Sequence, residues 1–358
     1  MTRVDRWEVG GEFHWTSLPE GEFVPWPAPV SWYLLARHAA ADLFRTLARR
    51  SDGIEHRPWS GHLWVPQYFC HDVAGYWKKF AEIRQYADDP RGAQPDWTTL
   101  KPAKNDAVLA VNFFGARAAK PWQRWHVKTG CILVEDHSHD PVSGWARNSK
   151  ADYAFSSLRK TIPVSDGAIL WSPIGHALTV AKEVDLSGSA LKLAAMVWKR
   201  DYLEGAAYAA DKSCYREWQR AGEDAFDRSA ILSAASSWSR AYLADGVPES
   251  WRRRRTANVR RLLRSLEDWP GAEPVFRAWP ADGVPMAAVF CFPSAAARDA
   301  VRKRLEEHSV YCPVHWPAPA DCELAVRELA ATILTIPADQ RYTGADMDRI
   351  VGILRNSG

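Results

Sequence analysis

The sequence is constrained most by short apolar runs that alternate with helix-like segments between residues 62 and 172. Two of these runs, DAVLAVNFFG at 106–115 and CILVED at 131–136, are almost continuously apolar. A strand buried on both faces has this pattern, whereas a strand with one face in water alternates apolar and polar residues. Between the two runs, KPWQRWHVKTG at 120–130 reads as a helix that ends at a glycine. The alternation predicts an α/β fold with a mostly parallel central sheet flanked by helices.

The remaining elements follow from periodicity and turn residues. Strands are expected at 62–66, 83–86, 153–158, 167–172, 286–294, 309–317 and 331–337. Helices are expected at 31–50, 72–83, 186–243 (interrupted), 251–269, 294–308 and 345–358. A length of 358 residues suggests two domains. We therefore expect an extended Pro- and Trp-rich arm at 1–30, a large α/β domain at 31–240 and a smaller C-terminal α+β domain at 241–358.

Composition removes several classes of protein. A formal net charge of +3 is too small to indicate a nucleic-acid partner. The six cysteines form no CxxC pair, which argues against a structural zinc site and against a secreted disulfide scaffold. The first residues lack the apolar core of a signal peptide, and no run of 18 apolar residues occurs. We expect a cytoplasmic protein with no membrane partner.

The chain contains 19 tryptophans, many of them beside a proline or a charge. Trp316, between a histidine and a proline, is one example. Two interpretations remain open for this set. The rings either cover the edges of the core, or line a substrate groove or subunit interface, where tryptophan is favoured.

A cluster of titratable residues, ILVEDHSHD at 132–140, closes the second buried strand. In open α/β sheets, ligands bind beyond the carboxyl ends of the strands. A metal site would use Asp136, His137, His139 and Asp140. However, adjacent side chains on an extended chain point in opposite directions, and no distant HExxH-type pair completes a ligand set. A structural cluster of polar loop residues is the third interpretation.

A lysine lies downstream of this cluster, in the segment AFSSLRKTIPVSDGAIL at 154–170. Lys160 follows a strand rich in serine and precedes a turn that contains Asp166 and Gly167. Pyridoxal phosphate needs this set of groups. A lysine amine forms a Schiff base with its aldehyde, a carboxylate pairs with its pyridinium nitrogen, and hydroxyls or helix-start amides hold its phosphate. The alternative is a solvated surface lysine.

These segments resemble the DegT/DnrJ/EryC1/StrS family, the sugar-aminotransferase-like group of fold-type-I pyridoxal-phosphate enzymes. The family's strand that ends in E-D-x-x-Q is matched by EDHSH at 135–139, and its Ser-strand, Lys and Gly-turn by FSSLRK and PVSDGA at 155–168. Looser matches are LARHAA at 35–40, VPQYFC at 65–70 and VNFFG at 111–115, with FCFPS and VYCPVHWP in the C-terminal part. The likeness covers most of the chain beyond residue 30.

The resemblance implies roles for individual residues around the cofactor. Lys160 is expected to bind pyridoxal 5'-phosphate covalently and to act as the acid and base of catalysis. Asp136 is expected to pair with the pyridine nitrogen. His139 stands where the family has glutamine and would donate to the phenolic oxygen of the ring. Ser156 or Ser157 would bind the phosphate.

Other positions complete the site that the resemblance implies. Arg37 and His38 stand at the second phosphate-binding position, where their backbone amides would act. Phe69, or else Tyr68, would stack on the ring. His315 would contact the substrate, or else be a packed histidine. The family's Gly-Thr is Ala36-Arg37 here and its Gly-rich turn is shortened to SDG, so the chain reads as a divergent member.

The run Arg252–Arg255 at the start of the helix predicted at 251–269 has two interpretations. It either meets the diphosphate of a nucleotide-linked sugar, or forms the solvated face of an amphipathic helix.

The function that the resemblance implies is transfer of an amino group, with glutamate as donor, to a keto group of a sugar nucleotide or other small keto metabolite in a biosynthetic pathway. Such enzymes are homodimers with shared active sites. Three rivals remain open. They are a pyridoxal-phosphate enzyme of another reaction type (elimination, replacement or oxidation), a catalytically silent protein of the same fold, and a metal hydrolase.

Overall fold

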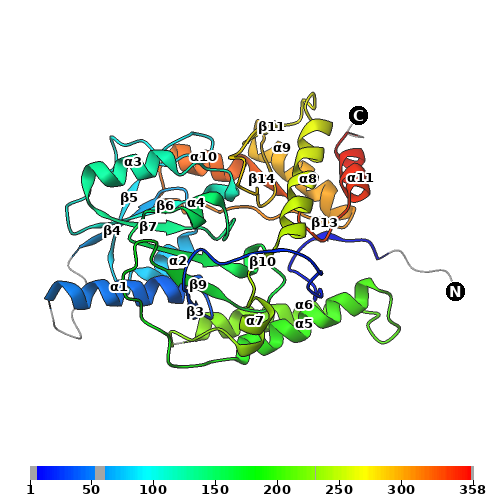
Figure 1. Ribbon diagram of the computed structural model, residues 1–358. Helices are drawn as coiled ribbons and strands as arrows, with labels where there is room; N and C mark the ends of the chain where they lie inside the picture. The colour runs from blue at the N-terminus through cyan, green and yellow to red at the C-terminus, as the bar shows by residue number, and fades with distance from the viewer. Residues whose placement is uncertain (1–5, 53–60, 230, 356–358) are drawn as a thin grey trace.

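The computed structural model describes residues 6–52, 61–229 and 231–355. The ends of two predicted segments, residues 1–5 of the arm and 356–358 of the last helix, lie outside this range. A seven-stranded sheet in the order β3-β9-β8-β7-β6-β4-β5 forms the centre (Figure 1). Its strands are β3 (Ser31–Tyr33), β4 (His62–Pro66), β5 (Glu82–Tyr86), β6 (Ala107–Val111), β7 (Ile132–Asp136), β8 (Tyr153–Ser157) and β9 (Ala168–Trp171).

Five of these strands, β4 to β8, run parallel to one another. The predicted mostly parallel sheet is therefore confirmed. All residues of β6 are buried, as expected for a strand covered on both faces. β9 is antiparallel to β8 because a short turn, not a crossover helix, joins the two strands.

The prediction that a helix begins at Ser31 is wrong. Ser31–Tyr33 forms β3, which pairs antiparallel with β9, and the helix begins three residues later at Ala36. Periodicity could not separate β3 from α1, because Trp32 and Tyr33 are good strand formers that also continue the apolar pattern of the helix.

Helices cover both faces of the sheet, with α1 below it and α3 above it in the view of Figure 1. One core cluster joins the sheet to α1 and α2, and another packs Trp122 of α3 and Trp145 of α4 on the opposite face. The helices of this part are α1 (Ala36–Asp52), α2 (His71–Trp77), α3 (Lys120–Thr129), α4 (Gly144–Arg147), α5 (Ser187–Leu203), α6 (Lys212–Arg228) and α7 (Ser237–Tyr242), with short 3-10 turns η1 (Phe113–Gly115) and η2 (Leu158–Lys160).

The C-terminal part has its own antiparallel sheet, β11-β12-β14, and its own apolar cluster. Its elements are β10 (Val247–Pro248), α8 (Glu249–Ser265), β11 (Glu273–Pro274), β12 (Ala288–Cys291), α9 (Ala295–Glu307), β13 (Val310–Tyr311), α10 (Leu324–Thr332), β14 (Ile333–Ile336) and α11 (Gly344–Arg355). The sequence did not predict α10. It predicted a strand at 309–317, of which only two residues are extended, because prolines at 313 and 317 limit the pairing.

The N-terminal segment crosses the molecule between α5 and the C-terminal part (Figure 1). Its strand β1 (Val9–Gly10) pairs with β13, and its strand β2 (Phe23–Val24) pairs with β10. Lys199 of α5 is buried against this segment, where its Nζ contacts Glu8 Oε1 at 2.6 Å and the carbonyl oxygen of residue 12 at 2.9 Å. The segment is thus anchored at several points.

Candidate functional site

The carboxyl ends of four parallel strands deliver the candidate residues to one edge of the sheet. Tyr68 and Phe69 follow β4, Phe113 and Phe114 follow β6, and the cluster at 136–140 follows β7. The lysine segment follows β8 directly. Neighbouring parallel strands place their carboxyl ends side by side, so segments far apart in the sequence meet here.

The residues of the 132–140 cluster point in different directions. His137 is fully buried away from this edge, where its Nε2 lies 2.9 Å from Glu135 Oε2. Trp145 donates to the other oxygen of that glutamate at 2.7 Å. Asp140 pairs with Arg252 of α8 at 2.6 Å and accepts from the N–H of Val284. These four contacts are structural and hold the β7 loop against α4, α8 and the loop before β12.

This divergence separates the side chains that a metal site in the cluster would need to bring together. Within the described residues, no group of three His, Cys, Asp or Glu side chains is placed to hold a metal ion. His137 and Asp140 are committed to Glu135 and Arg252. Of the other two members, His139 contacts Lys160, and Asp136 ends the strand next to β8, which leads to the lysine.

Asp136 ends β7 as a buried carboxylate with 6% of its surface exposed. One oxygen accepts the N–H of Ser138 at 2.8 Å. Among the described residues, its other oxygen has no hydrogen-bond partner and no cation lies within ion-pair distance. A buried carboxylate satisfied on only one oxygen is a ready acceptor for a cationic N–H group.

His139 has a fixed tautomer because a backbone N–H can only donate. The amide of Phe114 donates to its Nδ1 at 2.8 Å, so the proton of the neutral ring is on Nε2. That nitrogen faces Lys160 Nζ at 3.5 Å. Burial, with help from the positive charge of Lys160, holds the pKa of His139 well below 6.5. His139 therefore presents an N–H donor to the site.

Lys160 ends η2 and is held by the turn that follows it. Its side chain is exposed, and within the described residues no carboxylate lies within ion-pair distance of Nζ. The N–H of Leu158 donates to the carbonyl of Gly167, whose own N–H donates to the carbonyl of Leu34. Gly167 has φ +128, a conformation that favours glycine, and this explains why the turn needs its Gly. The turn that follows the lysine is thereby tied to the segment just before α1.

Aromatic rings line this edge in a stack that the sequence did not reveal. His139 lies between Phe114, at 5.4 Å and 17°, and Trp316, at 5.8 Å and 17°. Lys160 Nζ lies 5.4 Å from the centre of the same Trp316 ring. Trp316 was recognised only as one of many tryptophans near prolines, and a single sequence holds no signal that would have placed it here.

Phe69 and Tyr68, the two residues predicted to stack on the pyridine ring of the cofactor, differ in their surroundings. Phe69 is stacked on Trp77 at 5.6 Å and 27° and approaches Trp316 at 6.0 Å. Tyr68 donates its hydroxyl to the carbonyl of His315 and lies 5.5 Å from the Trp316 ring. Both therefore border the same edge as Lys160, through Trp316.

The structure separates the two candidate serines. Ser156 is fully buried, and its hydroxyl donates to the carbonyl of His137 at 3.0 Å. Ser157 is half-buried, and its hydroxyl makes no hydrogen bond within the described residues. Ser157 is thus the one with a hydroxyl free for a ligand.

At the start of α1, the amide of His38 already donates to the carbonyl of Leu35 at 3.0 Å, and the side chains of Arg37 and His38 make other contacts. Arg37 pairs with Asp227 of α6 at 2.8 Å and donates to the carbonyl of Phe226. His38 is fully buried, and neither ring nitrogen has a hydrogen-bond partner among the described residues. Burial, with the nearby charge of Arg37, lowers the pKa of His38 to about 4.

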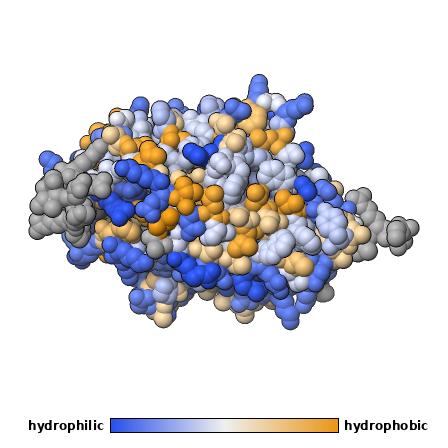
Figure 2. All heavy atoms as spheres, turned by 90° about the horizontal axis from the view of Figure 1, so that it is seen from below, coloured by the Kyte–Doolittle hydropathy of each residue, from blue (hydrophilic) through white to orange (hydrophobic). Residues whose placement is uncertain are grey.

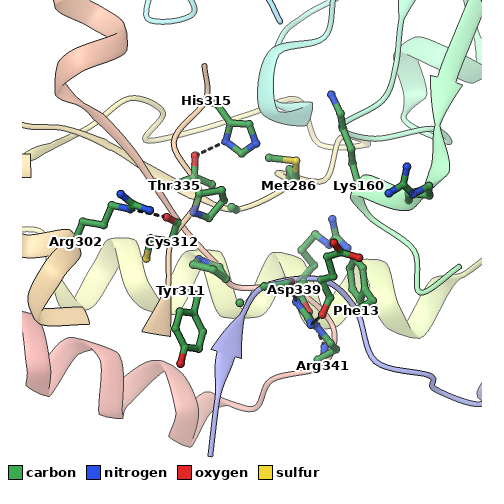
Figure 3. A pocket seen from close by; sticks show the side chains of 18 of the residues that line it. Phe13, Lys160, Met286, Arg302, Tyr311, Cys312, His315, Thr335, Asp339 and Arg341 are labelled. Atoms are coloured by element: carbon green, nitrogen blue, oxygen red, sulfur yellow. Dashed lines mark hydrogen bonds and ion pairs between the residues drawn. The ribbon is translucent and has the colours of Figure 1, made fainter. Parts of the chain in front are cut away.

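His315 and Lys160 both line a cavity of about 440 Å³ (Figure 3). Its Nδ1 lies 3.0 Å from the Thr335 hydroxyl, and burial, followed by the charge of Lys160, lowers its pKa to about 3. Met286 and Phe13 line the same cavity. A site that joins β8, the C-terminal strands and the N-terminal segment could not be read from the sequence.

The Arg252–Arg255 run is not a uniformly solvated face. Arg252 and Arg255 are buried, the first on Asp140 and the second beside the lysine turn, whereas the two arginines between them are exposed. The simple reading as a solvated helix face is therefore wrong for half of the run.

Comparison with known proteins identifies the fold. No protein-family model and no curated protein matches the sequence. Solved structures do match over nearly the whole chain. The aminotransferase TlmJ of Streptoalloteichus hindustanus is 16% identical, with 91% of this chain and 84% of that chain covered and a TM-score of 0.59. A DegT DnrJ EryC1 StrS aminotransferase of Brucella abortus is 15% identical, with 92% and 85% covered and a TM-score of 0.54.

A third similar structure has a different activity. The GDP-4-keto-6-deoxy-D-mannose-3-dehydratase of E. coli, with bound hydrated PLP, is 11% identical, with 91% and 87% covered and a TM-score of 0.58. The chain therefore has the fold of these proteins, and the predicted fold-type-I architecture is confirmed. The family resemblance seen in the sequence agrees with this fold.

Proposed function

We propose that this protein is a pyridoxal-phosphate-dependent enzyme of the aminotransferase type. The proposal rests on one observation. Lys160, Asp136 and His139 all lie at the carboxyl edge of the parallel sheet, at the ends of the neighbouring strands β7 and β8. The similar structures, one of them with bound PLP, support it at the level of fold.

The residues present fit the cofactor. Lys160 offers an amine without a carboxylate partner, and Asp136 offers a buried carboxylate with one oxygen free for the pyridinium nitrogen. The Nε2–H of His139 can donate to the phenolic oxygen. The free hydroxyl of Ser157 and the first amides of α1, at Ala36 and Arg37, are suited to the phosphate, since helix N-termini bind anions.

Each of these residues has a chemical task in the proposed reaction. Bound pyridoxal phosphate supplies a ring that delocalises the electrons released when a substrate carbon loses its proton. Lys160 would hold the group through its aldehyde and would move the proton at the substrate α-carbon. Asp136 would keep the ring nitrogen protonated. Neutral His139 donates a hydrogen bond and does not act as a base, because Nδ1 is already occupied by the amide of Phe114.

A single-turnover assay tests the proposal. The protein is loaded with pyridoxal phosphate, freed of excess, and incubated with glutamate alone, with 2-oxoglutarate as the measured product. We expect one 2-oxoglutarate per bound cofactor in the parent and none in Lys160→Ala. Lys150→Ala, a change at an exposed lysine, is the matched control and retains the activity. Equal product in the parent and in Lys160→Ala would refute the assigned lysine.

The acceptor in the second half of the reaction is proposed more coarsely, as a keto group on a sugar nucleotide or another small metabolite. The rival reaction types and the silent scaffold are tested by the same assay. A loaded protein that releases no keto acid from any amino acid tested would favour them, and one of the structures with the same fold is a dehydratase.

The homodimer with shared sites and the cytoplasmic location are likewise proposals. Figure 2 shows apolar side chains gathered along the middle of the lower face within a polar rim. Three large apolar residues between β9 and α5 (Ile174, Val180 and Val184) are exposed. Such a surface favours a second subunit. None of the helices in the described ranges has the length and apolar character of a membrane span.

A further inference from the structure

Two further cavities lie along α8, on a surface separate from the cavity in front of Lys160. One, of about 390 Å³, is lined by the first half of the helix, and the other, of about 490 Å³, by its second half. Ala257, Arg260 and Trp279 line both, so the two cavities form one continuous groove, which we call the α8 groove. Among the residues that the structure describes, none lines both this groove and the cavity in front of Lys160.

The α8 groove carries an excess of positive charge. Six arginines line it, against the two acids Glu249 and Asp282. Arg252 Nε lies 3.5 Å from Glu249 Oε2, and its Nη1 lies 2.6 Å from Asp140 Oδ1. The other five arginines are exposed and, within the described part of the chain, have no carboxylate within 4.0 Å; they are Arg147, Arg253, Arg260, Arg264 and Arg277. These five charges share the groove with a single unpaired acid, Asp282.

Three of the five arginines lie on one face of α8. Arg253, Arg260 and Arg264 are spaced seven and four residues apart, which places their side chains in one row. The row spans roughly 16 Å, from a rise of about 1.5 Å per residue. Arg277 and Arg147 line the groove from the segment after β11 and from the end of α4. Because like charges four residues apart destabilise a helix, an acidic ligand between these arginines would stabilise the surface.

The rest of the lining is largely apolar. It includes Ala257, Leu263, Ala278 and the half-buried Trp279, and Leu263 and Trp279 pack on the apolar cluster of the C-terminal part. Arg260 Cζ lies 5.6 Å from the centre of the Trp279 ring. An apolar groove with basic side chains is complementary to an amphipathic helix whose polar face is acidic. Single-stranded nucleic acid stacks successive bases on several exposed rings, whereas the described lining of this groove contains one aromatic ring, which is half-buried.

We propose that the α8 groove binds an acidic amphipathic helix of a partner protein. The carboxylates of that helix pair with the arginines of the groove, and its apolar side chains lie against Trp279 and Leu263. The row of arginines on α8 is matched in length by about three turns of the bound helix, which packs alongside α8. This interaction is independent of the chemistry proposed at Lys160.

Fluorescence anisotropy with a labelled peptide tests the proposal. The probe has about 18 residues, long enough to form a helix, with Glu on one face and Leu on the other. We expect the parent to bind it, with an affinity that falls as the salt concentration rises. The triple variant Arg253→Gln, Arg260→Gln and Arg264→Gln should bind roughly tenfold more weakly, as expected for the loss of three exposed ion pairs. The matched control removes the same charge from exposed arginines outside the groove and should keep the parental affinity; it combines Arg124→Gln, Arg216→Gln and Arg220→Gln.

A second variant, Ala257→Glu, guards against an effect of the triple substitution on folding. It places one acid at an exposed position in the middle of the groove and should also weaken binding of the peptide. Equal affinities of the parent and the triple variant, or no binding of the peptide by the parent, would overturn the proposal. A single-stranded DNA that binds the parent more tightly than the peptide would overturn it in favour of a nucleic acid. A change in the number of subunits between the parent and the triple variant, measured by sedimentation, would overturn it in favour of a second copy of this chain.

Discussion

Replacing Asp136 by Asn should weaken pyridoxal phosphate binding by a predictable amount. The buried carboxylate has one protein partner, the N–H of Ser138, and no cation within ion-pair distance among the described residues. The pyridinium N–H would supply the missing charged hydrogen bond, which contributes about 1.5–3 kcal/mol. Asparagine keeps the shape and an acceptor oxygen but loses the charge. We therefore expect a roughly 10- to 100-fold higher Kd for the cofactor.

The assay is a fluorescence titration of the apoprotein, with Asp268→Asn as a control at an exposed carboxylate. An analogue with carbon in place of the ring nitrogen completes a double-mutant cycle. The parent should bind the analogue more weakly than pyridoxal phosphate by the same factor, and Asp136→Asn should not distinguish the two. A variant that still prefers pyridoxal phosphate by the parental factor would refute the role given to Asp136.

Three further predictions follow from the same region. His139→Gln retains an N–H donor and should keep the cofactor affinity within about threefold. His139→Leu should lower that affinity about tenfold, as expected for the loss of one hydrogen bond. Equal affinities of the two variants in the same titration would contradict the donor role. The pKa of His38 is lowered from 6.5 to about 4, so the folded state stays neutral while the unfolded state gains a proton below pH 6.5. His38→Phe should therefore remove a loss of about 1.4 kcal/mol between pH 7.5 and pH 5.5 in urea unfolding; an unchanged pH dependence would show that the histidine is not held neutral. Arg252→Ala leaves Asp140 buried without its partner and should lower the free energy of unfolding by about 3–5 kcal/mol. The control Arg254→Ala, at an exposed position, should lower it by less than about 0.5 kcal/mol. Similar values for the two variants would mean that the Arg252–Asp140 pair does not hold α8 to the β7 loop.

The sheet was predictable because its strands are buried on both faces and carry an uninterrupted apolar signal. Gly130 at the end of α3 was predictable for a similar local reason, since it adopts a left-handed conformation. β3 was misread as the start of a helix because its three residues continue an apolar pattern without a break. α10 was missed because its tertiary contacts, rather than a clear sequence pattern, define it.

The candidate site divides in the same way. Asp136 ends one strand of the parallel sheet and Lys160 lies three residues beyond the end of the next, and topology alone brings such positions to one edge. Trp316 and Arg255 reach that edge from the C-terminal part, through long-range packing that has no local pattern. The separation of Ser156 from Ser157 depends on a single hydrogen bond to the His137 carbonyl, which sequence spacing cannot reveal.

The most direct test of the account is to locate the cofactor on the chain. The protein is incubated with pyridoxal phosphate, treated with borohydride to fix any bond to an amine, and digested for peptide mass spectrometry. The account predicts that a stoichiometric adduct lies on Lys160, and that Asp136→Asn reduces its yield at limiting cofactor. An adduct spread over exposed lysines, or none at Lys160 under saturating cofactor, would contradict it.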